Sequence, residues 1–130
     1  MLDHPDSIPR LESDYLSLRE SLGRLGDILL HANNPDDIRT AFHDSLLRAQ
    51  ELFHQEELEF ETIGCSTVEA NRNGHRKFIR DLGSLLHEYG ITGAGIPLAS
   101  EVRKTLLPWL HEHHRLIDQQ LSRRRAAAFQ

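Results

Sequence analysis

With 130 residues, 38% of them hydrophobic and 27% charged, the chain predicts one globular domain, residues 1–130, with a single core. The formal charge of -5 at pH 7 argues against a nucleic-acid-binding protein. No apolar stretch approaches the roughly 20 residues of a membrane span, and the N-terminus lacks a signal-peptide pattern. Cys65 is the only cysteine, which excludes an intrachain disulfide and favours a cytoplasmic location.

The first predicted helix covers about residues 10–30. Its apolar side chains recur at steps of three and four, which keeps them on one helical face. They are Leu11, Tyr15, Leu18, Leu22, Leu25 and Leu29. Turn-forming residues around Pro35 should end this helix, and Asp36 or Asp37 can support the start of the next by accepting free backbone N–H groups.

The second predicted helix covers about residues 36–63. Its inner face consists of Leu46, Ala49, Leu52, Phe53, Glu56, Phe60 and Ile63. Glu56 is unusual there, because a carboxylate on an apolar face is costly unless it is paired or bound to a metal. Gly64 suits the helix end, and residues 66–69 (Ser-Thr-Val-Glu) are compatible with a capping box for the third helix.

The third and fourth predicted helices cover about residues 67–89 and 98–122. Gly90 should end the third, and Pro108 should kink or locally unwind the fourth. The inner face of the third carries Val68, Asn71, His75, Phe78, Ile79, Leu82, Leu85 and Leu86; that of the fourth carries Val102, Leu106, Trp109, Leu110, His113, Ile117 and Leu121. Four amphipathic helices with short connections predict an all-α fold, an up-down-up-down antiparallel four-helix bundle.

Several polar side chains are predicted to meet inside this bundle. Tyr15, Glu56, Asn71, His75 and His113 lie on the inner faces at similar depths. Two imidazoles and carboxylates converging in a bundle core are typical of iron, manganese or zinc sites. They can equally satisfy each other as a buried hydrogen-bond and ion-pair network without a metal.

Asp118 follows His113 by five residues, which is about 140° around a regular helix. Both side chains can face the core only if they flank a shared centre or if the helix widens locally to a π-turn. The remaining histidines lack ligand spacing and are predicted on the surface: His4, His31, His43, His54, His87, His111 and His114. Cys65 is either a small half-buried residue or a thiol that responds to oxidants.

Three segments resemble the hemerythrin family. Residues 53–57 (Phe-His-Gln-Glu-Glu) look like the motif in which His-Phe is followed two residues later by Glu-Glu. The spacing then holds through Gly64 to His75 and Phe78, which match the second histidine of the family's third-helix His-x-x-x-His and its following Phe. Residues 109–118 match the family's Trp-Leu-x-x-His-x-x-x-x-Asp, the most specific of the three.

The resemblance covers residues 11–121 and implies the same bundle. In hemerythrins two irons share a bridging Glu and a bridging Asp, which correspond to Glu56 and Asp118. Two of the three histidines on one iron correspond to His75 and His113, and Asn71 takes the place of the third. The resemblance thus implies the metal ligands Glu56, His75, His113 and Asp118.

Both histidine ligands of the second iron are missing. Tyr15 stands in place of the first-helix His and Leu52 in place of the second-helix His. The resemblance therefore implies a bundle that has lost the full di-iron O₂ site and keeps at most a mononuclear-type site for iron, zinc or manganese. In the absence of a metal, Tyr15 and Leu52 would help to refill the vacated volume.

Three functions follow from this pattern as alternatives. The first is a non-haem metal-binding, sensory or regulatory domain acting on a small ligand or a protein partner, as a monomer or homodimer. The second is a metal-free structural or protein-interaction module. An enzyme such as a mononuclear metal oxidase, or a di-iron O₂ carrier, is disfavoured, because no base, nucleophile or substrate motif accompanies the ligands and the second iron lacks its nitrogen donors.

Overall fold

The computed structural model describes residues 7–31, 34–64, 67–93 and 95–128, with side chains from 10 to 123 within those ranges. It is all-helical, and no strand occurs in the described ranges. The predicted capping residue Ser66, together with Cys65 and His4, lies outside them. No helix of the described residues is long and apolar enough to cross a membrane.

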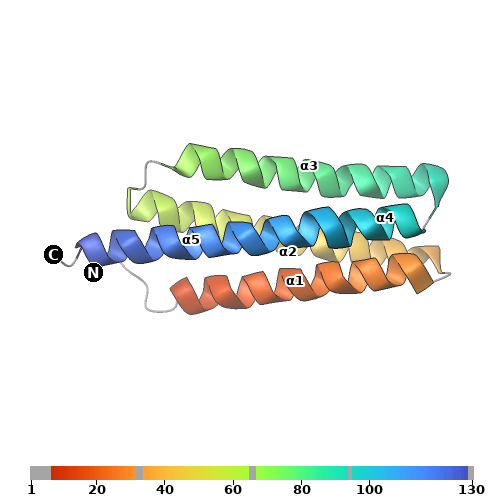
Figure 1. Ribbon diagram of the computed structural model, residues 1–130, viewed down its shortest axis with the longest axis horizontal. Coiled ribbons are helices and arrows are strands. Elements are labelled where there is room, and N and C mark those ends of the chain that lie inside the picture. The colour runs from red at the N-terminus through yellow and green to blue at the C-terminus, as the bar shows by residue number, and fades with distance from the viewer. Residues whose placement is uncertain (1–6, 32–33, 65–66, 94, 129–130) are drawn as a thin grey trace.

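The helices lie side by side along the long axis of the molecule (Figure 1). In chain order they are α1 (Ser7–His31), α2 (Pro35–Thr62), α3 (Val68–Thr92), α4 (Ile96–Glu101), the π-helix η1 (Val102–Leu106) and α5 (Leu107–Ala128). The segments α4, η1 and α5 follow one another without a break and together occupy the place of the predicted fourth helix.

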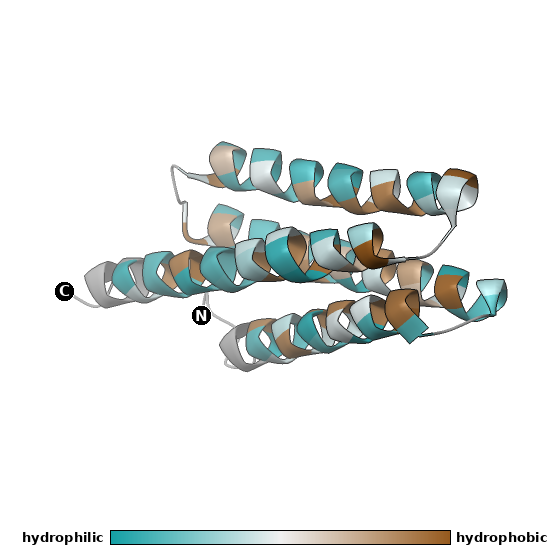
Figure 2. Ribbon diagram, turned by 45° about the vertical axis from the view of Figure 1, so that its right-hand side comes forward, coloured by the Kyte–Doolittle hydropathy of each residue, from teal (hydrophilic) through white to brown (hydrophobic). Residues whose placement is uncertain are grey.

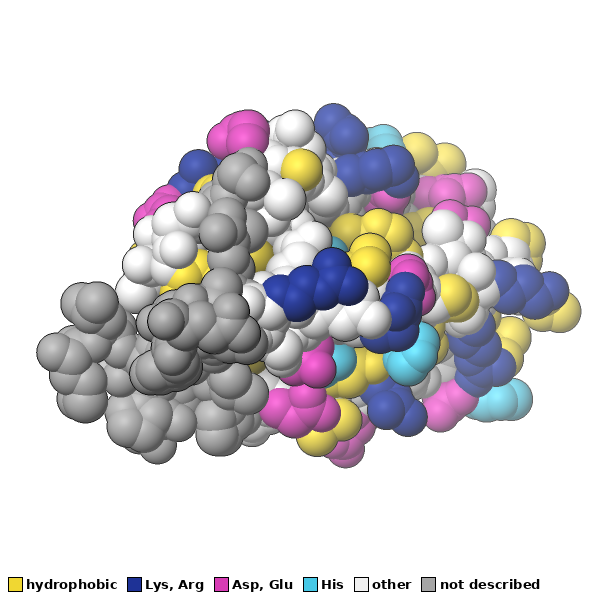
Figure 3. Space-filling view, turned by 60° about the vertical axis from the view of Figure 1, so that its left-hand side comes forward, with side chains coloured by type: hydrophobic (Ala, Val, Ile, Leu, Met, Phe, Trp, Pro, Cys, Tyr) yellow, Lys and Arg dark blue, Asp and Glu magenta, His cyan; other side chains and the backbone are white. Residues whose placement is uncertain are grey.

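The core lies where the apolar faces of these helices meet, and in Figure 2 the hydrophobic residues lie mainly on the sides of the ribbons that face neighbouring helices. Every residue predicted on the inner face of α1 is buried. In the other helices the predicted faces also point inward, with most members buried and eight half-buried: Leu46, Ile63, Val68, Asn71, Ile79, Leu86, Trp109 and His113. Charged side chains of both signs are interspersed over the face drawn in Figure 3.

The start of α2 differs in detail from the prediction. Asn34 is the N-cap, and its side-chain oxygen accepts a hydrogen bond from the Asp36 N–H at 2.9 Å. Pro35 follows at the first helical position, where its missing N–H costs nothing. Asp36 and Asp37 therefore lie in the first turn, and neither is the cap. Their negative charges interact favourably with the positive end of the helix dipole.

The end of α3 was predicted at Gly90, but the helix continues to Thr92. The helical hydrogen-bond pattern carries on through that glycine, and the Gly93 N–H donates to the Tyr89 carbonyl at 2.8 Å. Gly93 itself has a φ of 81°, a left-handed conformation that glycine adopts without steric cost. The helix thus ends at Gly93, where the chain turns, and not at Gly90.

The predicted disturbance around Pro108 takes the form of the π-helix η1, directly before α5. The inward residues Val102, Leu106 and Leu110 are spaced by four, which on a regular α-helix would rotate the face by about 80°. The wider π-turn compensates for this rotation, and all three side chains are buried. Residues on both sides of η1 therefore face the same core.

Candidate metal centre

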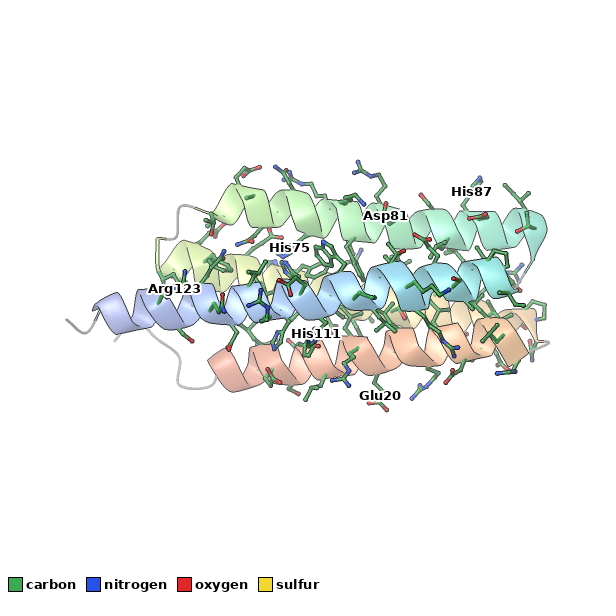
Figure 4. All side chains as sticks on the ribbon, in the orientation of Figure 1. Glu20, His75, Asp81, His87, His111 and Arg123 are labelled. Carbon is green, nitrogen blue, oxygen red and sulfur yellow. The ribbon has the colours of Figure 1, made fainter. Side chains whose placement is uncertain are left out.

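Three side chains from three helices meet in the interior. Glu56 comes from α2, His75 from α3 and His113 from α5. Glu56 Oε1 lies 2.9 Å from the Nε2 atoms of both histidines, and the two Nε2 atoms are 3.1 Å apart. Figure 4 shows His75 between α3 and α5. Within the described residues these three form the one group of His, Cys, Asp or Glu that could jointly hold a metal ion.

The site is shielded from solvent. The exposed fractions of the side chains are 1% for Glu56, 3% for His75 and 9% for His113. The Phe53 ring stacks on His75 with centroids 4.2 Å apart, and the Trp109 ring stacks on His113 at 4.6 Å. Because both imidazoles are held by aromatic faces, their planes are fixed before any ligand binds.

A further carboxylate orients His75 from outside the centre. Glu57 Oε2 lies 2.7 Å from the Nδ1 of His75, and its other oxygen accepts a hydrogen bond from the Arg72 Nε at 3.2 Å. An ionised carboxylate can only accept, so His75 carries a proton on Nδ1. In the neutral imidazole, Nε2 then presents its lone pair to Glu56 and His113, as metal-ligating histidines do.

The charge of Glu56 is stabilised in place. Burial raises the pKa of this carboxyl, but when both imidazoles carry a proton on Nε2, hydrogen bonds and positive charge from His113 and His75 outweigh burial and hold the pKa below its ordinary value of 4.5. Its second oxygen, Oε2, is buried and has no hydrogen-bond partner among the described residues. A buried anion with a free acceptor atom is an environment that favours a cation.

The donor set fits a divalent transition metal. Two donors at right angles, each about 2.1 Å from an ion, are about 3.0 Å apart, close to all three separations in this triangle. Two imidazoles and one carboxylate suit iron, manganese or zinc. Glu56, His75 and His113 could thus hold one metal ion through one face of its coordination shell.

The structure does not bring Asp118, the fourth predicted ligand, to this cluster. Its side chain is exposed, while His113 points inward. Residues 107–128 form a regular α-helix, so Asp118 is rotated by about 140° from His113. The π-turn that could have brought both inward occurs earlier, at Val102–Leu106.

Leu52, Asn71 and Tyr15 are the residues that the resemblance to hemerythrins places at further ligand positions. Leu52 is fully buried in the core, and Asn71 is half-buried with an amide nitrogen that has no partner among the described residues. Tyr15 is also buried, but it contacts α5: its hydroxyl lies 3.3 Å from His111 Nδ1, and its ring stacks on His114 at 3.8 Å. Its contacts therefore join α1 to α5.

The surface predictions are correct for all but one of the other histidines that the structure describes. His31, His43, His54 and His87 are exposed, and His111 is exposed although it reaches Tyr15. His114 was predicted on the surface, but only 18% of its side chain is exposed, because it stacks on Tyr15 and bonds Glu12 at 2.7 Å. This contact depends on where α1 lies beside α5, which helical periodicity does not specify.

Glu57 contacts the candidate site in a way that the sequence analysis did not predict. It directly follows Glu56, which places it about 100° away on α2, toward α3 and the outer side of His75. The motif at residues 53–57 includes Glu57 without giving it a role, because that role depends on the position of His75 on another helix.

Known proteins provide no independent assignment for this site. No family model, curated protein or solved structure matches the chain. The hemerythrin resemblance therefore rests on the motifs within the sequence alone. What this chain can do must be argued from the geometry of Glu56, His75 and His113.

Proposed function

We propose that this chain is a hemerythrin-like bundle that binds a single divalent transition metal through Glu56, His75 and His113. In this proposal it acts as a metal-dependent sensory or regulatory domain, not as a di-iron O₂ carrier. A bound ion would supply open coordination positions to a small ligand. The chain's own contribution is a dry site and three donors already in place.

The proposal rests on three potential metal-ligand atoms that lie close together. Glu56 Oε1 and the Nε2 atoms of His75 and His113 are separated by 2.9, 2.9 and 3.1 Å. With a proton on Nδ1, a neutral His75 turns a lone pair toward Glu56 Oε1, which carries negative charge itself. Two such acceptors in contact repel each other unless a cation or a further proton lies between them. A metal ion removes this repulsion for all three donors at once.

The bundle topology and the lost second site also support the proposal. In Figure 1 the colour gradient reverses direction from α1 to α2, from α2 to α3 and again into α4, as in an up-down-up-down antiparallel arrangement. Tyr15 and Leu52, which replace two histidines of the hemerythrin pattern, are 4% and 0% exposed and fill the core. A site for one metal ion, without its second neighbour, is consistent with both features.

The competing function is a metal-free structural or interaction module. It is favoured by the same 2.9 Å separations, which are also ordinary hydrogen-bond lengths if His75 and His113 both donate to Glu56. In that state His75 must be doubly protonated, since Glu57 holds its other nitrogen. The two functions therefore differ in what occupies the centre, a metal ion or an extra proton.

Metal stoichiometry separates the two functions. The chelator-treated full chain is reconstituted with Zn²⁺, and separately with Fe²⁺ under anaerobic conditions, and bound metal is measured by elemental analysis after desalting. We expect one equivalent per chain for at least one ion, and a raised melting temperature, because an ion that binds only the folded state stabilises it by mass action.

Two variants locate the ion. His113→Ala removes a donor and should abolish stoichiometric binding, whereas His54→Ala removes an exposed histidine of α2 and should leave it unchanged. A chain that binds no ion and melts at the same temperature with and without metal would establish the metal-free module instead. Binding of two iron equivalents per chain, both released together when the oxidation state of the irons changes, would instead support a di-iron site.

A further inference from the structure

A surface pocket of about 380 Å³ lies between α2 and α3, beside the candidate metal centre, and His75 forms part of its lining. Its α2 wall is formed by Gln50, Phe53, His54 and Glu57, which are spaced by three, four and seven residues and so share one face of the helix. The volume is within the range of small-molecule sites in proteins. Neither the sequence motifs nor the metal centre assign a role to this pocket.

The α3 wall adds an apolar residue flanked by two guanidinium groups, Ile79 between Arg76 and Arg80. Ile79 and Phe53 give the pocket an apolar part, while both arginines and His54 are exposed at its edge. A pocket with an apolar interior and a cationic edge matches a ligand that has an apolar body and an anionic end.

The cationic edge is not neutralised by its neighbours. Arg80 has no ion-pair or hydrogen-bond partner in the part of the chain that the structure describes. Arg76 makes only exposed contacts, to Asn73 at 3.1 Å and to Glu69 at 3.6 Å. At least one guanidinium is therefore available to a ligand.

Glu57 is the one acidic residue of the lining, against two arginines, and both of its oxygens are already engaged. Its two oxygens are engaged by His75 at 2.7 Å and by Arg72 at 3.2 Å. The pocket edge therefore retains a positive charge, from Arg80 above all. Electrostatics favour an anion there and disfavour a cation.

We propose that the pocket between α2 and α3 binds a small organic carboxylate with an aromatic or branched apolar body. The body packs on Phe53 and Ile79, and the carboxylate pairs with Arg80, with Arg76 and His54 beside it. Because His75 lines the pocket and the Phe53 ring stacks on it, a bound ligand lies against a side chain of the candidate metal centre. The pocket does not require the metal, so the proposal stands or falls separately from the function proposed above.

Three matched probes test both halves of the ligand. Phenylacetate has an apolar body and a charge, phenylacetamide keeps the body without the charge, and acetate keeps the charge without the body. Each is titrated into the ¹⁵N-labelled, chelator-treated full chain while amide shifts are followed by NMR. We expect saturable shifts with phenylacetate at residues of the pocket, and binding at least about tenfold weaker for the other two.

Substitutions of surface arginines identify the residue that pairs with the carboxylate of the ligand. Arg80→Gln should weaken phenylacetate binding about tenfold and leave phenylacetamide unchanged, because only the anion uses the guanidinium. Arg39→Gln is the matched control, since Arg39 is an exposed arginine of α2 outside the pocket, and should have no effect. Both arginines of this comparison are exposed, so the fold is retained.

Three results would overturn the proposal: shifts that do not saturate, shifts that saturate but map away from α2 and α3, or equal affinities for phenylacetate and phenylacetamide. Unchanged phenylacetate affinity in Arg80→Gln would also refute it. The titration is repeated with metal-loaded protein, where altered affinity would indicate communication through Phe53, and unchanged affinity would indicate an independent pocket; either supports binding.

Discussion

The substitution Glu57→Gln tests whether the Glu57 carboxylate holds His75 in position for a metal ion. The Glu57 carboxylate lies 2.7 Å from the His75 Nδ1 but is not itself a donor to the centre. Its removal leaves Glu56, His75 and His113 in the chain. Any loss of metal affinity must therefore act through the orientation and basicity of His75.

The size of the effect follows from this contact. Loss of a hydrogen-bonding partner behind a ligating histidine typically lowers metal affinity by about 10- to 100-fold, which corresponds to about 1.4–2.8 kcal/mol. Gln keeps a carbonyl oxygen that can accept the Nδ1 proton, so Glu57→Gln should lie near the tenfold end. Glu57→Leu removes the acceptor and should lie near the hundredfold end.

Glu61→Gln is the matched control. Glu61 also pairs with Arg72, but it does not contact His75. Affinities for Zn²⁺ are measured by competition with a chromophoric chelator, and melting temperatures are recorded for the metal-free forms. Glu61→Gln should bind Zn²⁺ with wild-type affinity. Equal affinities in Glu57→Gln, Glu57→Leu and Glu61→Gln would refute the assignment of Glu57 as a positioning residue.

Three further predictions address the site and the fold. Asp118→Ala should leave the bound metal at the wild-type stoichiometry in elemental analysis, because this side chain is exposed and outside the cluster. Phe42→Ala should lower the free energy of unfolding in urea by about 3–5 kcal/mol, since Phe42 is fully buried. For Asp44, the hydrogen bond from Ser21 lowers the pKa below 3.8, burial opposes this, and Arg48 lowers it further. A lowered folded-state pKa stabilises the protein above the ordinary value and loses that effect as pH falls through the folded-state value. Asp44→Asn should therefore be less stable than wild type at pH 7, with a difference that shrinks below about pH 4; a difference that grows in acid would contradict this reasoning.

Much of the candidate site was predictable because burial on a helix is a local property. Glu56, His75 and His113 each occupy a position in an apolar face whose period follows from 3.6 residues per turn. All three are turned to the interior and meet there. The assignment of these side chains to the core required no knowledge of how the helices are placed.

For Asp118, helical periodicity and the motif gave conflicting predictions. The motif spacing favoured it as a ligand, whereas the helical period disfavoured it, and the two could be reconciled only by a local π-turn. The structure contains a π-turn, but at Val102–Leu106, before His113, so it aligns the apolar faces and leaves Asp118 exposed. A motif match could not decide this, since the backbone geometry between the two residues determines it.

The sequence by itself determined the helices, their inner faces and the inward placement of Glu56, His75 and His113, because each depends on contacts within a few turns of one chain segment. Only the tertiary structure decided that Glu57 contacts His75, that Tyr15 stacks on His114, and that a pocket with an unpaired Arg80 lies between α2 and α3. These contacts depend on the rotation and axial offset of one helix relative to another. Such quantities are set by side-chain packing across the whole core, and hydrophobic periodicity does not encode them.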